Sequence, residues 1–171
     1  EPFRDAMLAA SGGLDSQMFG TFQVWKPKVF SVDDTNSETA RFQTRRRSLY
    51  MPVVRTTLQE MMELFDVGDP NSITSRRSNT IVAHQALFLL NNAFVQERAQ
   101  GLSDRVLAGS GDEGRQIEQA WWLVLSRPPT LAERSRASEF LAASRKTAEG
   151  SSREAWASLA RALFSLNEFL Y

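Results

Sequence analysis

Apolar residues in the second half of this 171-residue chain recur with the period of an α-helix, and this pattern limits the fold more than any other feature. One stripe spans about residues 83–107, with a break expected near Asn91 and Asn92. A second helix is predicted around residues 117–124. It should stop before Pro128-Pro129, because proline cannot continue a helix.

Capping residues mark two further helices. Thr130 with Glu133 three positions later has the pattern of a capping box, which predicts a helix from there to about Thr147. A last helix should follow Gly150, since apolar residues again recur on one face. These residues are Trp156, Leu159, Leu163 and Leu166. Several helices with short connections favour a mainly α fold, a helical bundle of about four to six helices.

The first half of the chain is less regular. Residues 2–11 are predicted as a short helix that ends at Gly12-Gly13. Residues of about 14–48 show no sustained period, so we expect a long irregular N-terminal segment there. Residues 49–54 predict at most a short edge strand, because their proline lacks a backbone donor. Residues 57–65 fit a helix of two to three turns.

Composition and charge exclude several classes of protein. An apolar share of 42% favours one globular domain over residues 1–171, with a helical core at about 83–170. Twenty basic residues balance 20 acidic ones, which argues against nucleic acid as a partner. No apolar run is long enough for membrane insertion by this segment. Without cysteine there is no thiolate metal site or covalent haem attachment, and no cofactor is expected in this domain.

Candidates for catalytic chemistry are few. His84 is the only histidine, and because it lies inside a predicted helix we favour a surface or packing role over that of a base. Acidic side chains could form a carboxylate-only site, but their spacing matches no metal loop, so no metal site is expected. The acids considered are Asp33, Asp34, Glu38, Glu60, Glu63, Asp66 and Asp69. A free-standing hydrolase is the least favoured class.

Arginines form the most unusual local feature of the sequence. They are Arg45, Arg46, Arg47, Arg55, Arg76 and Arg77. Guanidinium groups bind carboxylates or phosphates with two parallel hydrogen bonds. In the favoured interpretation the arginines pair with Glu63, Asp66 and Asp69 and fix the irregular region. In the alternative they line a cleft that meets an anion, a sugar or a neighbouring domain.

Two more side chains are candidates for contacts. Trp121 lies on a predicted core stripe, whereas Trp122 points about 100° away and is the better candidate for an interface. Gln85 and Asn91 can share a helix face, where their amides would satisfy backbone groups of a loop. The candidate ligand or domain contacts are therefore Arg46, Arg47, Arg55, Asp66, Asp69, Arg76, Arg77, Gln85 and Trp122.

Several sequence runs carry a family resemblance. The first is residues 46–55, RRSLYMPVVR; the others are 63–66 with 69–71, Arg76-Arg77 with Thr80, 85–91 with 94–95, 125–130 with Glu133, and 162–171. In this order they resemble the planctomycete-specific domain-one family (PSD-one), a domain of unknown function. One departure is Ala83, which stands where the family pattern tends to have proline.

This resemblance implies the C-terminal part of a larger periplasmic or cell-envelope protein, in many cases with cytochrome-c-like modules upstream. The family supplies no catalytic residues. We therefore expect a non-catalytic helical interaction or scaffold module whose partners are the upstream domains of the same polypeptide. One alternative is half of a polysaccharide-modifying or redox active site shared with the preceding domain. The other is a small-anion or sugar-binding module with a carbohydrate ligand.

Overall fold

The computed structural model describes residues 1–19, 44–51, 60–68, 71, 73, 83–109, 111–147 and 151–170. These residues form α1 (Pro2–Ala10), the 3-10 turn η1 (Ser48–Tyr50), α3 (Glu60–Leu64), α4 (Ala83–Asn91), α5 (Ala93–Leu107), α6 (Glu113–Leu125), α7 (Leu131–Thr147), α8 (Ser152–Phe164) and α9 (Asn167–Leu170). Within these ranges, β pairing is limited to an isolated bridge between Asp15 and Arg46. The prediction of a mainly α fold is confirmed. No helix in the described ranges is both long and apolar enough to span a membrane.

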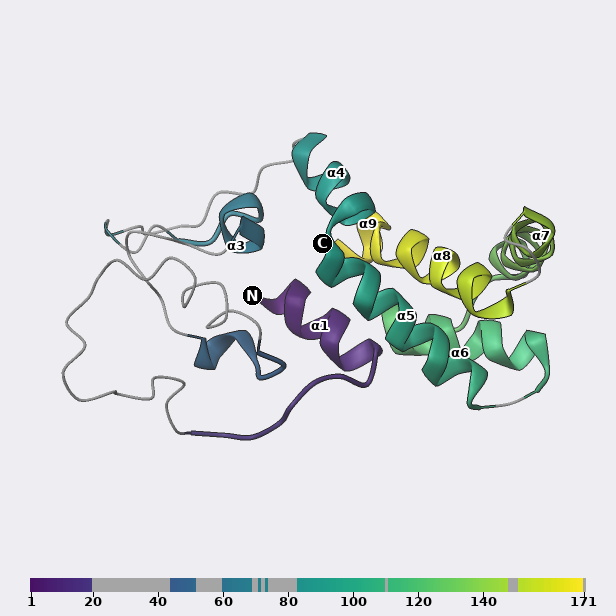
Figure 1. Cartoon of the computed structure of the whole chain (residues 1–171), viewed down its shortest axis with the longest axis horizontal. Helices are drawn as coiled ribbons and strands as arrows, with labels where there is room; N and C mark the ends of the chain where they lie inside the picture. Colours follow the sequence, from purple (N-terminus) through teal and green to yellow (C-terminus); the bar gives the residue numbers. More distant parts are fainter. Residues whose placement is uncertain are drawn as a thin grey trace.

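The hydrophobic core lies around α5, which crosses the middle of the helical body (Figure 1). α5 makes its most extensive contacts with α8 and further contacts with α1, α4 and α6, while α7 packs on α6 and α8. Fully buried apolar side chains from these helices meet there, including Met7, Val95, Leu102, Ile117, Leu141, Trp156 and Phe164. Burying each large apolar side chain contributes roughly 1.5–3 kcal/mol, so this cluster is the main source of stability.

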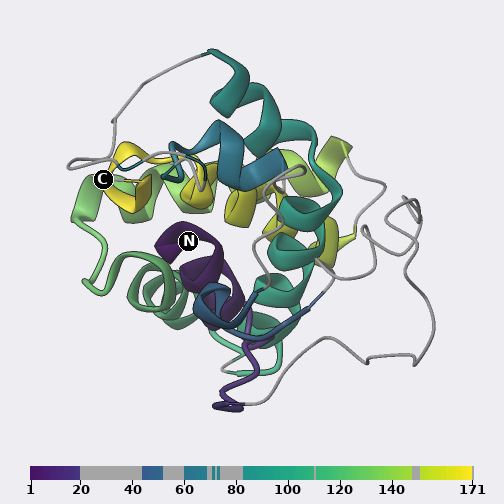
Figure 2. The same ribbon diagram turned by 90° about the vertical axis from the view of Figure 1, so that its left-hand side faces the viewer.

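Aromatic rings extend the core toward the N-terminal half. The ring centroids of Phe3 on α1 and Phe65 after α3 are 5.0 Å apart, and those of Phe65 and Phe88 on α4 are 6.0 Å apart. Phe3 also lies 5.3 Å from Phe169 of α9. Figure 2 shows the resulting order, with α3 between α1 and α4.

The break between α4 and α5 falls where the sequence predicted it. Asn92 is the N-cap of α5, and its side-chain oxygen accepts a hydrogen bond of 2.9 Å from Phe94 N. The N–H of Asn92 still bonds to Phe88 O at 2.8 Å, so α4 ends as α5 begins. The asparagine side chain thus competes with the backbone and divides the stripe into two helices.

The predicted capping box is also confirmed. Glu133 Oε2 accepts from Thr130 N at 2.7 Å, and Thr130 Oγ1 accepts from Glu133 N at 3.3 Å. α6 ends just before, where Ser126 takes the left-handed conformation with φ +56° and its N–H bonds to Trp122 O. The two prolines that follow prevent any continuation.

The structure differs from the prediction at the start of the expected edge strand. Leu49 and Tyr50 lie in η1, and only the flanking Arg47 and Met51 are extended. The reason is a contact with α1, because Asp5 accepts hydrogen bonds from both Ser48 N and Ser48 Oγ and so fixes the turn. Residues 52–59, which hold the rest of that strand and the first part of the helix predicted at 57–65, lie outside the described residues.

Candidate functional site

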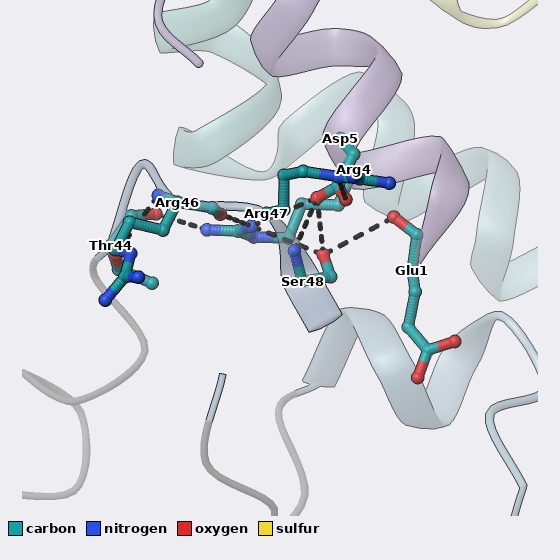
Figure 3. A network of polar contacts seen from close by, with 7 residues as sticks. All are labelled: Glu1, Arg4, Asp5, Thr44, Arg46, Arg47 and Ser48. Atoms are coloured by element: carbon teal, nitrogen blue, oxygen red, sulfur yellow. Dashed lines mark hydrogen bonds and ion pairs between the residues drawn. The ribbon is translucent and has the colours of Figure 1, made fainter. Parts of the chain in front are cut away.

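A buried arginine network joins α1 to residues 44–48 (Figure 3). Arg4 has only 1% of its surface exposed. Its Nη1 donates to Arg46 O at 2.9 Å and to Ser48 Oγ at 3.3 Å, and its Nη2 donates to Thr44 O. These bonds satisfy the carbonyl groups of Thr44 and Arg46, so Arg4 fastens residues 44–48 to the helical body.

Asp5 supplies the carboxylate of this network. Its Oδ1 lies 3.5 Å from Arg4 Nη1 and accepts from Ser48 N at 2.8 Å and from Ser48 Oγ at 2.7 Å. Arg47 approaches the other oxygen, with 3.9 Å between Arg47 Nε and Asp5 Oδ2. The acid that meets Arg4 and Arg47 therefore comes from α1. The expected pairing of the arginine run with Glu63, Asp66 and Asp69 stays a prediction, because Arg55, Asp69, Arg76 and Arg77 lie outside the described residues.

Arg46 points inward. Its surface is 6% exposed, and its Nε and Nη2 donate to Gln17 O at 3.2 and 3.0 Å. Nη2 also donates to Phe19 O, and the guanidinium lies 4.9 Å from the centroid of the Tyr50 ring. These contacts hold residues 15–19 against residues 44–50, which is a structural role for this predicted contact residue.

Arg4 and Arg98 both lie over the ring of Phe94, at 5.6 and 5.5 Å from its centroid. Burial lowers the pKa of Arg4, the adjacent Asp5 carboxylate raises it, and the nearby Arg98 guanidinium lowers it again. Arg98 is 8% exposed and pairs with Glu97 at 3.1 Å. The aromatic face offsets part of the cost of bringing two cations out of water.

The other predicted contact residues lie on different elements and have different roles. The Arg47 side chain is 56% exposed. Gln85 is buried on α4 and donates from Nε2 to Leu64 O at 2.9 Å, so its amide bonds to backbone at the end of α3. Asp66 has φ +54° after α3, and Trp122 is 52% exposed on α6. Arg55, Asp69, Arg76 and Arg77 lie outside the described residues.

Sequence reasoning missed Arg4, Asp5, Ser48 and Arg98. One signal was available, since Arg4 stands three and four positions before Met7 and Leu8 and therefore lies on the buried face of α1. An arginine on an apolar stripe requires internal acceptors. Nothing local indicates that those acceptors are more than 40 positions away.

An exposed apolar surface lies on α4. Leu87 and Leu90 are 55% and 54% exposed, and Ala83 and Ala86 on the same face are exposed as well. The opposite face of the helix buries Gln85, Phe88 and Leu89. We call the four exposed residues the α4 surface. They follow the spacing i, i+3, i+4, i+7 of a single helix face.

A groove of about 440 Å³ lies between the first half of α6 and the first half of α7. Its lining combines charged, hydroxyl and apolar side chains. The lining residues are Glu113, Gly114, Ile117, Leu131, Arg134, Ser135, Ser138 and Glu139. No group of three or more metal-ligating side chains occurs in the portion of the chain that the structure describes.

The fold and the arginine network together define a mainly helical domain whose buried arginines hold residues 15–19 and 44–48 beside α1. A family model described as PSD1, protein of unknown function (DUF1553), matches residues 1–141, so the chain belongs to this family. The resemblance noted in the sequence is confirmed, and the run at 162–171 lies beyond the matched residues. No curated protein and no solved structure matches the chain significantly.

Proposed function

We propose that this chain is a non-catalytic interaction module of a larger cell-envelope protein, and that its α4 surface packs against another domain of the same polypeptide. The observation that carries the proposal is the pair Leu87 and Leu90, each more than half exposed on a helix whose other face is buried. Soluble proteins seldom leave a continuous apolar helix face open to water unless it meets a partner.

The size of the α4 surface favours a covalently linked partner. Two leucines and two alanines on a helix of nine residues offer far less than the roughly 800 Å² per partner that stable association of separate proteins needs. A domain in the same polypeptide is held at a high effective concentration, so a small contact is sufficient. The surface carries no Lys, Arg, Asp or Glu, which also suits an interface between domains.

The inward position of Arg46 supports this function over an active site shared with the preceding domain. A shared site would need arginines that reach a ligand, whereas Arg46 donates to carbonyl groups of its own chain. Arg45 and Arg47, both exposed, are the described arginines of this run that would contact a neighbouring domain. The envelope location and the cytochrome-c-like neighbours implied by the resemblance stay part of the proposal.

The test is site-specific photo-crosslinking in the full-length polypeptide. A photoreactive amino acid replaces Leu90 in one sample and Leu131, an 88% exposed leucine at the start of α7, in the control. We expect crosslinked peptides that join α4 to another domain of the same molecule, and none of these from position 131. Absence of such peptides at position 90, or crosslinks only between separate molecules, contradicts the proposal.

A further inference from the structure

The α6–α7 groove is the described concave site in which polar groups from two helices converge. At about 440 Å³ it falls within the range of small-molecule sites. Ile117 is 1% exposed and forms part of its apolar floor, while Leu131 at the rim is 88% exposed. The groove is distinct from the α4 surface, so its role does not depend on the proposed domain contact.

The acidic oxygens of the groove already have donors. Glu113 Oε1 accepts from Ser138 Oγ at 2.8 Å, and Glu113 Oε2 pairs with Arg145 Nη2 at 2.8 Å. Glu139 Oε1 accepts from Ser135 Oγ at 2.9 Å. The acids and hydroxyls are therefore largely engaged with one another, and the charge of Glu113 is balanced by Arg145.

Arg134 is the exception. Its side chain lines the groove and has no hydrogen-bond or ion-pair partner among the described residues. Gly114 permits its position, because a Cβ at that residue would collide with the Arg134 guanidinium. Gly114 is the second residue of α6, and the Arg134 guanidinium lies over it.

The backbone adds donors beside Arg134. Asp112 caps α6 by accepting from Arg115 N at 2.9 Å, and the first backbone bond of the helix runs from Gln116 N to Asp112 O. The N–H groups of Glu113 and Gly114 precede that bond and have no carbonyl partner within the helix. The Arg134 guanidinium and these two N–H groups are hydrogen-bond donors without a partner in the helix or the groove. A ligand that fits them carries hydrogen-bond acceptors.

We propose that the α6–α7 groove binds a singly charged carboxylate that carries a short apolar body. Arg134 receives the carboxylate through two parallel N–H···O bonds, which is the geometry that guanidinium favours. The apolar body lies against Ile117 and Leu131. The carboxylate of Glu139, which also lines the groove, opposes a doubly charged anion such as phosphate more than a singly charged one.

The test is a titration of the isotope-labelled chain followed by amide chemical shifts. The probes are hexanoate, hexan-1-ol and inorganic phosphate. For hexanoate we expect saturable shifts at the amides of Gly114, Leu131 and Ser138, with hexan-1-ol and phosphate binding at least about tenfold more weakly, since each lacks one of the two complementary parts.

Matched variants separate the guanidinium from general charge. Arg134→Gln should weaken hexanoate binding at least about tenfold, whereas Arg136→Gln, two positions away on α7 and outside the groove lining, should leave it unchanged. Both arginines are exposed, so both variants should keep the native spectrum. The proposal is overturned by the absence of saturable shifts, by equal hexanoate binding to Arg134→Gln, or by tighter binding of phosphate or hexan-1-ol than of hexanoate.

Discussion

Arg4 Nη1 donates a hydrogen bond of 2.9 Å to the carbonyl oxygen of Arg46, 42 positions later in the chain. One arginine on the first helix thereby holds the backbone of another, and that second arginine holds Gln17 O in turn. Arg4 and Arg46 thus act in series as internal ties. They explain how residues 15–19 and 44–48, which share only an isolated bridge, are held beside α1.

Replacement of Arg4 by methionine should therefore destabilise the chain strongly. Arg4→Met leaves the carbonyl groups of Thr44 and Arg46 without their donor and Asp5 without its closest cation, at a cost of about 2–4 kcal/mol. Urea unfolding followed by circular dichroism measures the change. Arg136→Met, at an exposed position on α7, is the control and should stay within about 0.5 kcal/mol of the native chain. Equal stabilities of the two variants would show that the Arg4 network contributes little.

A second network fastens the C-terminal helix. Arg127 Nη1 and Nη2 donate to Glu133 at 2.9 and 2.7 Å, and Nε and Nη2 donate to Glu168 on α9 at 2.6 and 2.7 Å. The hydrogen bonds from Arg127 hold the pKa of both carboxyl groups below their ordinary value of 4.5. Glu168 thereby ties α9 to Arg127, which lies between α6 and α7.

This network predicts a specific pH dependence of stability. The pKa of Glu133 and of Glu168 is lower in the folded chain than in the unfolded chain. Both carboxylates therefore stabilise the folded chain fully above pH 4.5, near the pKa of the unfolded state. This stabilisation is lost as the pH falls toward the pKa of each group in the folded chain. Calorimetry should therefore find the native Tm above that of Arg127→Gln at pH 7, with a difference that shrinks between pH 4.5 and pH 3. In Arg136→Gln the native pH profile should persist. A difference between native and Arg127→Gln that is the same at pH 3 and pH 7 would exclude this role.

Local chemistry made much of the fold predictable. The capping box at Thr130 and Glu133, and the break at Asn92, depend on side chains that bond to backbone groups within three positions, so the sequence contains the whole interaction. The prediction of a strand from Leu49 was wrong because the deciding contact is not local. Its conformation is set by Asp5 through Ser48, 43 positions away, and propensity cannot reveal such a partner.

The same distinction applies to the candidate contacts. Arg46 was identified from an unusual run of arginines, but its acceptors are backbone carbonyls, and any residue type can supply a carbonyl. Composition therefore indicated that a guanidinium network exists without indicating its partners. Trp122 is an exception, since helical geometry alone placed it away from buried Trp121, and the structure leaves it 52% exposed.

Asp66 offers a test of whether a candidate contact residue acts through its backbone. It has φ +54°, and the Val67 N–H after it bonds to Met62 O at 3.0 Å, which closes the end of α3. Glycine adopts this left-handed conformation freely, whereas alanine loses about 1–2 kcal/mol of stability in it. Asp66→Gly and Asp66→Ala both remove the carboxylate, so a difference between them reports on the backbone. In urea unfolding Asp66→Gly should be more stable than Asp66→Ala by about 1 kcal/mol. Equal stabilities of the two variants would show that the backbone conformation of residue 66 contributes little.

The two faces of α4 should respond differently to truncation in the isolated chain. Leu89 is 2% exposed and contributes to the core, so Leu89→Ala should cost about 2–4 kcal/mol. Leu87→Ala and Leu90→Ala remove side chains that are more than half exposed, and each should change stability by no more than about 0.5 kcal/mol. Urea unfolding of the three variants measures these changes under one condition. A cost at Leu87 or Leu90 as large as that at Leu89 would mean that this face is covered within the chain itself, and the α4 surface would then be unavailable to another domain.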